Sequence, residues 1–184
     1  MHDIQQNKQL GGVLAALCIC CAASQAWAEA TLLGREVSLQ VVTFDDPNAP
    51  IFESDVKWAA TSNEIEFGLQ RTKSPEDIDV IPVLIDVQST HITFNYNTAV
   101  PGELYPAKFN GYIIDFHAGC DLVTGASLDT SDTTLPIGDD ALFWDKDRLY
   151  VNVQGQSFNR KSRIAIDLEI NDCQPESGGK KSKS

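Results

Sequence analysis

The chain has 184 residues, of which 42% are hydrophobic and 22% are charged, a balance typical of a globular protein rather than a disordered one. Because 14 Lys and Arg stand against 26 Asp and Glu, the formal net charge is −12, which disfavours nucleic acid and anionic membranes as partners. The same charge favours cations or basic partners, and it also keeps a protein soluble outside the cytoplasm.

Residues 1–28 have the order of a secretory signal peptide. A polar start is followed by an apolar run from Leu10 to Ala23, and small residues at Ala26 and Ala28 precede the expected cleavage site. The run of about 14 residues is shorter than the about 20 that a transmembrane helix needs, so we expect no integral membrane span. Lipoprotein processing is the alternative, because Cys18, Cys20 and Cys21 lie near the end of the run. It needs a small residue just before the cysteine, and Leu17, Ile19 and Cys20 are poor at that position. We expect export to the periplasm or the extracellular medium, with a mature chain that begins at residue 29.

The two remaining cysteines, Cys120 and Cys173, predict a disulfide, because an even pair in an exported chain is normally oxidised. Closing the loop between them would stabilise the fold by roughly 4 kcal/mol. His117 lies three residues before Cys120, which raises the alternatives of a metal site or a cysteine nucleophile. A metal would need two more ligands and a nucleophile would need a free thiol, so we favour the disulfide.

Apolar and polar residues alternate through most of the mature chain, with the period of half-buried β-strands. In chain order, these segments lie near residues 36–41, 55–60, 65–67, 91–97, 148–154 and 163–170. Their expected apolar faces are Val37, Leu39 and Val41; Val56, Trp58 and Ala60; Ile65 and Phe67; Ile92, Phe94 and Tyr96; Leu149, Val151 and Val153; and Ile164, Ile166, Leu168 and Ile170.

Two further segments are more apolar, and residues 109–116 carry apolar side chains on both faces. Residues 80–87 contain Pro82, which lacks a backbone donor and predicts an edge strand or the start of one. Residues 109–116 predict a central strand. Roughly eight to ten short strands, with a turn about every 8 to 12 residues, predict an all-β fold, an antiparallel β-sandwich or jelly roll. We expect a single domain over residues 29–175 and a disordered basic tail over residues 176–184.

The C-terminal third carries one resemblance. Residues 109–112 read Phe-Asn-Gly-Tyr, and residues 149–158 run from a strand through Gly155 to Phe158, with a last alternating strand after them. This pattern resembles one found in secreted bacterial β-sandwich proteins of unassigned function. The resemblance implies the fold and implies nothing about an activity.

Acidic residues crowd residues 129–147, largely in expected loops. Ca²⁺ takes six to eight oxygen ligands, which clustered loop carboxylates and carbonyls supply, so a calcium site is one hypothesis. Turns also favour aspartate for its own hydrogen bonds, and the spacing matches no EF-hand. The cluster consists of Asp129 and Asp132, followed by the predicted calcium ligands Asp139, Asp140, Asp145 and Asp147.

Three aromatic side chains are candidates for stacking on a ligand: Trp144 beside the Asp145-Lys146-Asp147 turn, Tyr150 on the polar face of its strand, and Tyr105. Glu64 and Glu66 lie on one strand face and would serve glycoside hydrolysis only if another element placed them across a cleft. We expect them to be solvated surface instead, and we expect His91 to be exposed.

The sequence favours an exported, non-enzymatic binding module that recognises a glycan, a matrix polymer or a surface protein. The alternative is a structural subunit of an extracellular matrix or filament, assembled through edge strands. A small exported hydrolase ranks third, because titratable residues do not converge on a motif, and no cofactor beyond Ca²⁺ is expected.

Overall fold

The computed structural model describes residues 30–73 and 78–173, and these residues are almost entirely β-structure. The predicted signal peptide and the predicted tail lie outside the described residues. The fold is all-β with antiparallel pairing throughout, as the period of two predicted. Within the described residues, no helix has the length and apolar character that crossing a membrane requires.

The described residues form fifteen strands and one short 3₁₀ turn, η1 (Asp139–Ala141). The strands are β1 (Glu36–Phe44), β2 (Phe52–Glu53), β3 (Lys57–Ala60), β4 (Phe67–Gly68), β5 (Thr72–Lys73), β6 (Asp79–Val80), β7 (Leu84–Val87), β8 (His91–Asn95), β9 (Gly102–Glu103), β10 (Phe109–Asp115), β11 (Val123–Leu128), β12 (Leu142–Asp145), β13 (Arg148–Asn152), β14 (Ser157–Phe158) and β15 (Arg163–Ile170).

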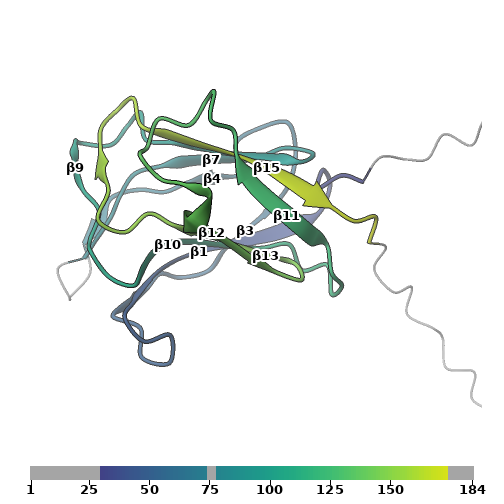
Figure 1. Cartoon of the computed structure of the whole chain (residues 1–184), viewed down its shortest axis with the longest axis horizontal. Helices are drawn as coiled ribbons and strands as arrows, with labels where there is room; N and C mark the ends of the chain where they lie inside the picture. The colour runs from purple at the N-terminus through teal and green to yellow at the C-terminus, as the bar shows by residue number, and fades with distance from the viewer. Residues whose placement is uncertain (1–29, 74–77, 174–184) are drawn as a thin grey trace, which may run out of the picture.

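Two sheets pack face to face as layers of a sandwich (Figure 1). The β10 sheet has the order β12-β13-β10-β1-β2, with β3 also paired to β1, and the β15 sheet has the order β11-β15-β8-β7-β4. Two strand pairs, β14 with β9 and β5 with β6, stand outside these sheets. The core lies between the layers and includes the fully buried Leu39, Ile114, Leu149, Ile92, Phe94, Ile164 and Ile166.

Strand β10 is central, as its apolar character on both faces predicted. It pairs with β1 over seven residues, from Ser38 opposite Asp115 to Phe44 opposite Phe109, and with β13 on its other side. The inward side of β1 is the predicted one, but Ser38 and Val42 on its other side are also buried. Side chains from the neighbouring strands therefore cover much of the outward side of β1.

One apolar face was assigned to the wrong side. Val56 and Trp58 were expected inside, but they are 46% and 57% exposed. In the next predicted segment Phe67 is buried as expected, whereas Ile65 is exposed. The register explains the error: β3 places Trp58 opposite Ser38 on the outer side of the sheet, while the small Ala59 packs towards the core. Alternation defines two faces of a strand, and at an edge the smaller residue can be the one that faces inward.

The apolar segment 80–87 is two strands rather than one edge strand. Val80 ends β6, which pairs with β5, whereas β7 begins at Leu84 and lies between β8 and β4. Pro82 lies in the gap between them, where a residue without a backbone donor interrupts no ladder.

The predicted disulfide is confirmed. Cys120 and Cys173 are bonded, with their Cα atoms 6.4 Å apart. The bond joins the loop that follows β10 to the segment that follows β15, and so connects the ends of strands from the two sheets. It also fixes the loop that carries His117.

Candidate functional site

The solvent-facing side of the β10 sheet collects side chains that are far apart in the sequence. The strand registers place Trp58, Ser38, Asp115 and Arg148 in one row across β3, β1, β10 and β13. The next row holds Gln40, Ile113, Tyr150 and Phe143, the last from β12. We call this surface the outer sheet face.

Aromatic side chains lie along this face. Trp58 is 57% exposed and Phe143 is 50% exposed, while Tyr150 is half-buried between them. Strands stand about 4.8 Å apart, so Trp58 on β3 and Tyr150 on β13 are separated by roughly 14 Å across the sheet. A shallow hollow of about 320 Å³ lies between these two side chains. The face is therefore an elongated platform with aromatic groups towards both ends.

Polar groups between the aromatics form a connected chain. Ser38 Oγ lies 2.8 Å from His117 Nε2, and His117 Nδ1 lies 3.4 Å from Asp115 Oδ1. The other oxygen of Asp115 accepts a hydrogen bond from Arg148 Nε at 2.8 Å. Further along the sheet, the Tyr150 hydroxyl donates to Asp145 Oδ2 at 3.1 Å. The links join β1, β10, β12 and β13 with the loop that follows β10, so the sheet register sets much of the geometry of the chain.

The electrostatics fix the state of two of these groups. A hydrogen bond with the Tyr150 hydroxyl, followed by the carboxylate of Asp115, holds the pKa of Arg148 above its ordinary value. Burial raises the pKa of Tyr150, although its hydrogen bond with Arg148 acts in the opposite direction. Arg148 is consequently a permanent cation, and Tyr150 remains a neutral phenol at physiological pH.

His117 is held in an unusual backbone conformation. Its φ of 48° lies in the left-handed region, which few residues other than glycine adopt. Asp115 Oδ1 stabilises this turn by accepting the backbone N–H of His117 at 2.8 Å. The neighbouring loop is fixed by the Gly119 N–H donating to Asp147 Oδ2 at 2.8 Å and by the disulfide at Cys120. Backbone strain of this kind is often stored where a side chain must point in a functional direction.

The imidazole of His117 also stacks on the ring of Trp58. The ring centroids are 4.4 Å apart and the planes are 20° from parallel. Trp58 and Ser38 therefore approach the imidazole from β3 and β1, and Asp115 approaches it from β10. The side chain has little freedom to leave this position.

The outer sheet face thus combines flat aromatic groups with hydrogen-bonding groups of defined orientation. No family model, curated protein or solved structure matches this chain. What the face binds is therefore judged from its chemistry. Aromatic rings offer apolar area with a polar rim, and the adjacent Gln40, Arg148 and Asp145 offer both donors and acceptors.

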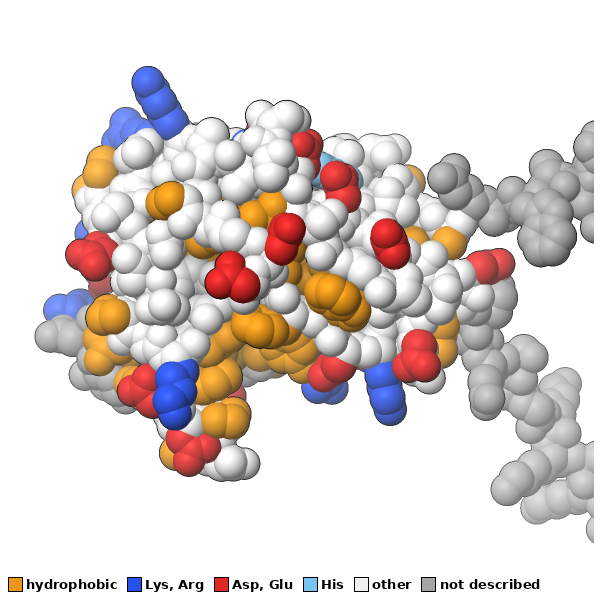
Figure 2. All heavy atoms as spheres, viewed as in Figure 1, with side chains coloured by type: hydrophobic (Ala, Val, Ile, Leu, Met, Phe, Trp, Pro, Cys, Tyr) orange, Lys and Arg blue, Asp and Glu red, His pale blue; other side chains and the backbone are white. Residues whose placement is uncertain are grey.

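The three aromatics predicted from the sequence lie in different places. Tyr150 is on the outer sheet face, as its position on the polar side of its strand indicated. Trp144 lies opposite Leu149, on the reverse side of β12, and is 41% exposed at the sheet edge. Tyr105 lines a separate hollow. Hydrophobic side chains form a band across the side of the molecule where β12 lies, with acidic groups on either side (Figure 2).

Three of the four predicted calcium ligands hold part of the backbone or a neighbouring side chain. Asp139 Oδ1 accepts the Leu128 N–H at 2.8 Å, while Asp145 and Asp147 accept from Tyr150 and Gly119. Asp140 lies in η1 with Asp139. Among residues 30–73 and 78–173, no three His, Cys, Asp or Glu side chains gather as they would around a metal ion. The calcium hypothesis therefore rests on the sequence alone.

Glu66 and His91 have structural partners. The Glu66 carboxylate accepts the backbone N–H groups of Ser62 and Val87, each at 2.7 Å, and so ties two segments together. Glu64 is exposed and makes no pair with it across a cleft. His91 was expected to be exposed, but it is half-buried and bonded to Asp167 at 2.7 Å, because β8 and β15 place the two residues directly opposite.

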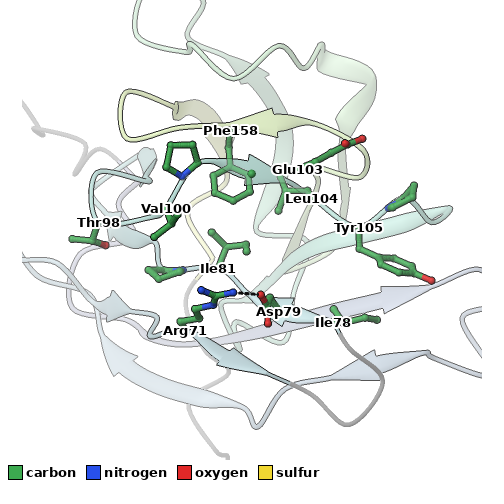
Figure 3. Close-up of a pocket in the computed structure, with 14 residues that line it drawn as sticks. Arg71, Ile78, Asp79, Ile81, Thr98, Val100, Glu103, Leu104, Tyr105 and Phe158 are labelled. Carbon is green, nitrogen blue, oxygen red and sulfur yellow. Dashed lines mark hydrogen bonds and ion pairs between the residues drawn. The ribbon is translucent and has the colours of Figure 1, made fainter.

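A larger hollow of about 670 Å³ lies beside the loop that leads into β9 (Figure 3). Its walls include Ile81 and Phe158 together with three charged residues, of which Arg71 and Asp79 bond to each other at 2.6 Å and Glu103 is the third. Apolar side chains and prolines nevertheless make up most of the lining of this hollow. The outer sheet face has the greater convergence of polar groups, and we place the candidate site there.

Most residues of this site were not predicted from the sequence. Phe143 could have been found, because a hairpin through the Asp145-Lys146-Asp147 turn places it opposite Tyr150. Ser38, Asp115 and Arg148 could not, because their proximity depends on which strands become neighbours. Trp58 was expected in the core because alternation alone does not show which side of β3 faces inward.

Proposed function

We propose that this protein is an exported binding module whose outer sheet face holds an uncharged carbohydrate chain. The face is long and open rather than deep, which suits a polymer better than a small molecule. The net charge of −12 disfavours an acidic polymer, and the disulfide fits an oxidising compartment.

One observation carries the proposal: Trp58, Tyr150 and Phe143 share one face of one sheet, with fixed polar groups between them. Exposed aromatic side chains in such numbers need a reason, because a solvated strand face normally carries polar residues. The apolar faces of sugar rings stack on aromatic rings, while their hydroxyls require donors and acceptors nearby. The outer sheet face supplies both along its length.

The test compares two tryptophans of similar exposure on different surfaces. Binding of a soluble β-1,3-glucan, a β-1,4-glucan and a galactomannan would be measured by affinity electrophoresis and titration calorimetry. Removing an apolar contact of this size costs about 1.5–3 kcal/mol, so Trp58→Ala should weaken binding at least tenfold. Trp144→Ala should leave binding unchanged. Loss of binding in Trp144→Ala alone would place the site at the β12 edge instead. If neither the unmutated protein nor a variant binds these polysaccharides, the proposal is refuted.

A second candidate function is assembly through β12. This strand is the last in its sheet among the described strands, and it exposes Phe143 and Trp144 on its two sides. An edge strand with unpaired backbone groups and exposed aromatics is a template for another strand. Sedimentation would show concentration-dependent oligomers that Trp144→Pro abolishes, because the backbone N–H of residue 144 faces away from β13. A monomer at all concentrations would exclude assembly through β12.

A further inference from the structure

We propose that Ser38, His117 and Asp115 form a centre that hydrolyses carboxylic esters, with acyl groups on the bound carbohydrate as the substrate. The choice of substrate rests on the proposed function, whereas the catalytic chemistry does not. Both the hollow and the three side chains belong to the outer sheet face.

The geometry has the order that an activated nucleophile requires. A hydroxyl, an imidazole and a carboxylate lie in sequence, with Ser38 Oγ 2.8 Å from Nε2 and Asp115 Oδ1 3.4 Å from Nδ1. The two ring nitrogens thus lie near different partners, and in the tautomer with its proton on Nδ1, on the side of Asp115, Nε2 accepts from the Ser38 hydroxyl. Nucleophile, base and orienting group within such distances are the recognised arrangement for acyl transfer, on any fold.

The surroundings favour catalysis rather than a passive contact. Ser38 sits on a central strand and is only 6% exposed, yet it lines the hollow through which an ester would reach it. His117 is held by its left-handed backbone, by Trp58 and by Asp115. Arg148 lines the same hollow and carries N–H donors suited to the negative charge that develops on the ester oxygen.

The reaction consumes one water and needs no other reactant. Ser38 Oγ attacks the carbonyl carbon while His117 Nε2 takes its proton, giving a tetrahedral intermediate. The bond to the alcohol oxygen then breaks, and His117 returns the proton to that oxygen, leaving an acyl-serine. A water attacks the acyl-serine with His117 again taking the proton, which passes to Ser38 Oγ as the carboxylic acid leaves. Asp115 remains ionised and orients the imidazole throughout.

The first test uses p-nitrophenyl acetate and a fluorophosphonate probe on the exported protein. Saturable release of p-nitrophenol is expected, with at least a hundredfold loss in Ser38→Ala and in His117→Asn, which keeps a residue tolerant of the left-handed backbone. Ser127→Ala is the matched control, because Ser127 is an exposed serine on β11 of the other sheet. Peptide mapping of the unmutated protein should find the probe, with its fluoride displaced, on Ser38.

The positioning role of Asp115 has its own readout. Asp115→Asn should lower kcat for p-nitrophenyl acetate while leaving KM within about twofold, since the carboxylate acts on the imidazole rather than on the substrate. A change in KM alone would show that Asp115 only shapes the hollow. Thermal melting of each variant confirms that the fold is intact.

A small ester does not need the aromatic side chains that would bind a carbohydrate. The experiments can therefore refute ester hydrolysis and carbohydrate binding independently. Hydrolysis without glucan or galactomannan binding would keep the catalytic centre and remove the carbohydrate as its substrate. Equal hydrolysis by Ser38→Ala and Ser127→Ala, or a probe adduct elsewhere than Ser38, would overturn the centre itself. If both activities are present, release of acetate from acetylated glucan should depend on Ser38 as well as on Trp58.

Discussion

Two tyrosines in the core make stability sensitive to alkaline pH. Tyr96 and Tyr112 are buried, and their hydroxyls lie 3.0 Å apart between the sheets. Burial raises the pKa of Tyr112 to about 12 and raises the pKa of Tyr96 well above its ordinary value. In the unfolded chain both phenols ionise near pH 10.

A raised pKa in the folded state gives stability that is complete below pH 10 and is lost as the pH rises towards 12. Over this range the unfolded chain releases protons that the folded protein retains, so the free energy of unfolding falls. Linkage gives a loss on the order of 1 kcal/mol per tyrosine between pH 9 and pH 11, or roughly 2–3 kcal/mol for the pair. That loss is a large fraction of a typical folding free energy.

Urea unfolding at pH 9 and pH 11 measures the loss. Tyr96→Phe and Tyr112→Phe should each reduce the difference between the two pH values by about half, whatever their effect on stability at pH 9. Tyr105→Phe is the control, because Tyr105 is 44% exposed and lies outside the core. If the double variant Tyr96→Phe/Tyr112→Phe loses as much stability on alkalinisation as Tyr105→Phe, the assignment of the effect to these phenols is refuted.

Three further substitutions test the architecture. Gly111→Ala should destabilise the fold by about 4 kcal/mol or more in urea unfolding, because a Cβ at this position would overlap the Val151 carbonyl oxygen; a loss under 1 kcal/mol would mean that β10 and β13 move apart easily. Replacing both Cys120 and Cys173 with serine should cost about 4 kcal/mol, since the bond closes a separation of 53 residues, and an unchanged melting temperature would contradict this. Glu66→Ala should cost about 1–3 kcal/mol because it leaves the Val87 N–H unpaired, whereas the same loss in Glu64→Ala would show a general charge effect.

The pattern of apolar and polar residues was sufficient to predict a feature wherever the residues of one segment determine that feature by themselves. The central position of β10 followed from apolar residues on both of its faces, and the disulfide followed from an even cysteine count in a chain expected to be exported. The orientation of β3 did not follow, because its two faces carry Trp58 and Ala59 and only the pairing with β1 decides which is inside. Residues 80–87 were divided by contacts with β5 and β8 that no local pattern contains.

The candidate site, like the orientation of β3, depends on which strands pair with one another. Ser38 and His117 are 79 residues apart in the sequence, and they meet because β1 and β10 pair in the register that sets Ser38 opposite Asp115. A shift of that register by one residue would move Ser38 into the core and Leu39 to the surface, so the burial of Val37, Leu39 and Val41 indirectly fixes the serine against the imidazole. The same alternation that predicted the fold therefore positions the site, but only once the neighbouring strands are known. Because buried apolar residues fix the register, Ser38→Ala should remove the serine hydroxyl without shifting the strands. The variant therefore tests the proposed chemistry without disturbing the fold.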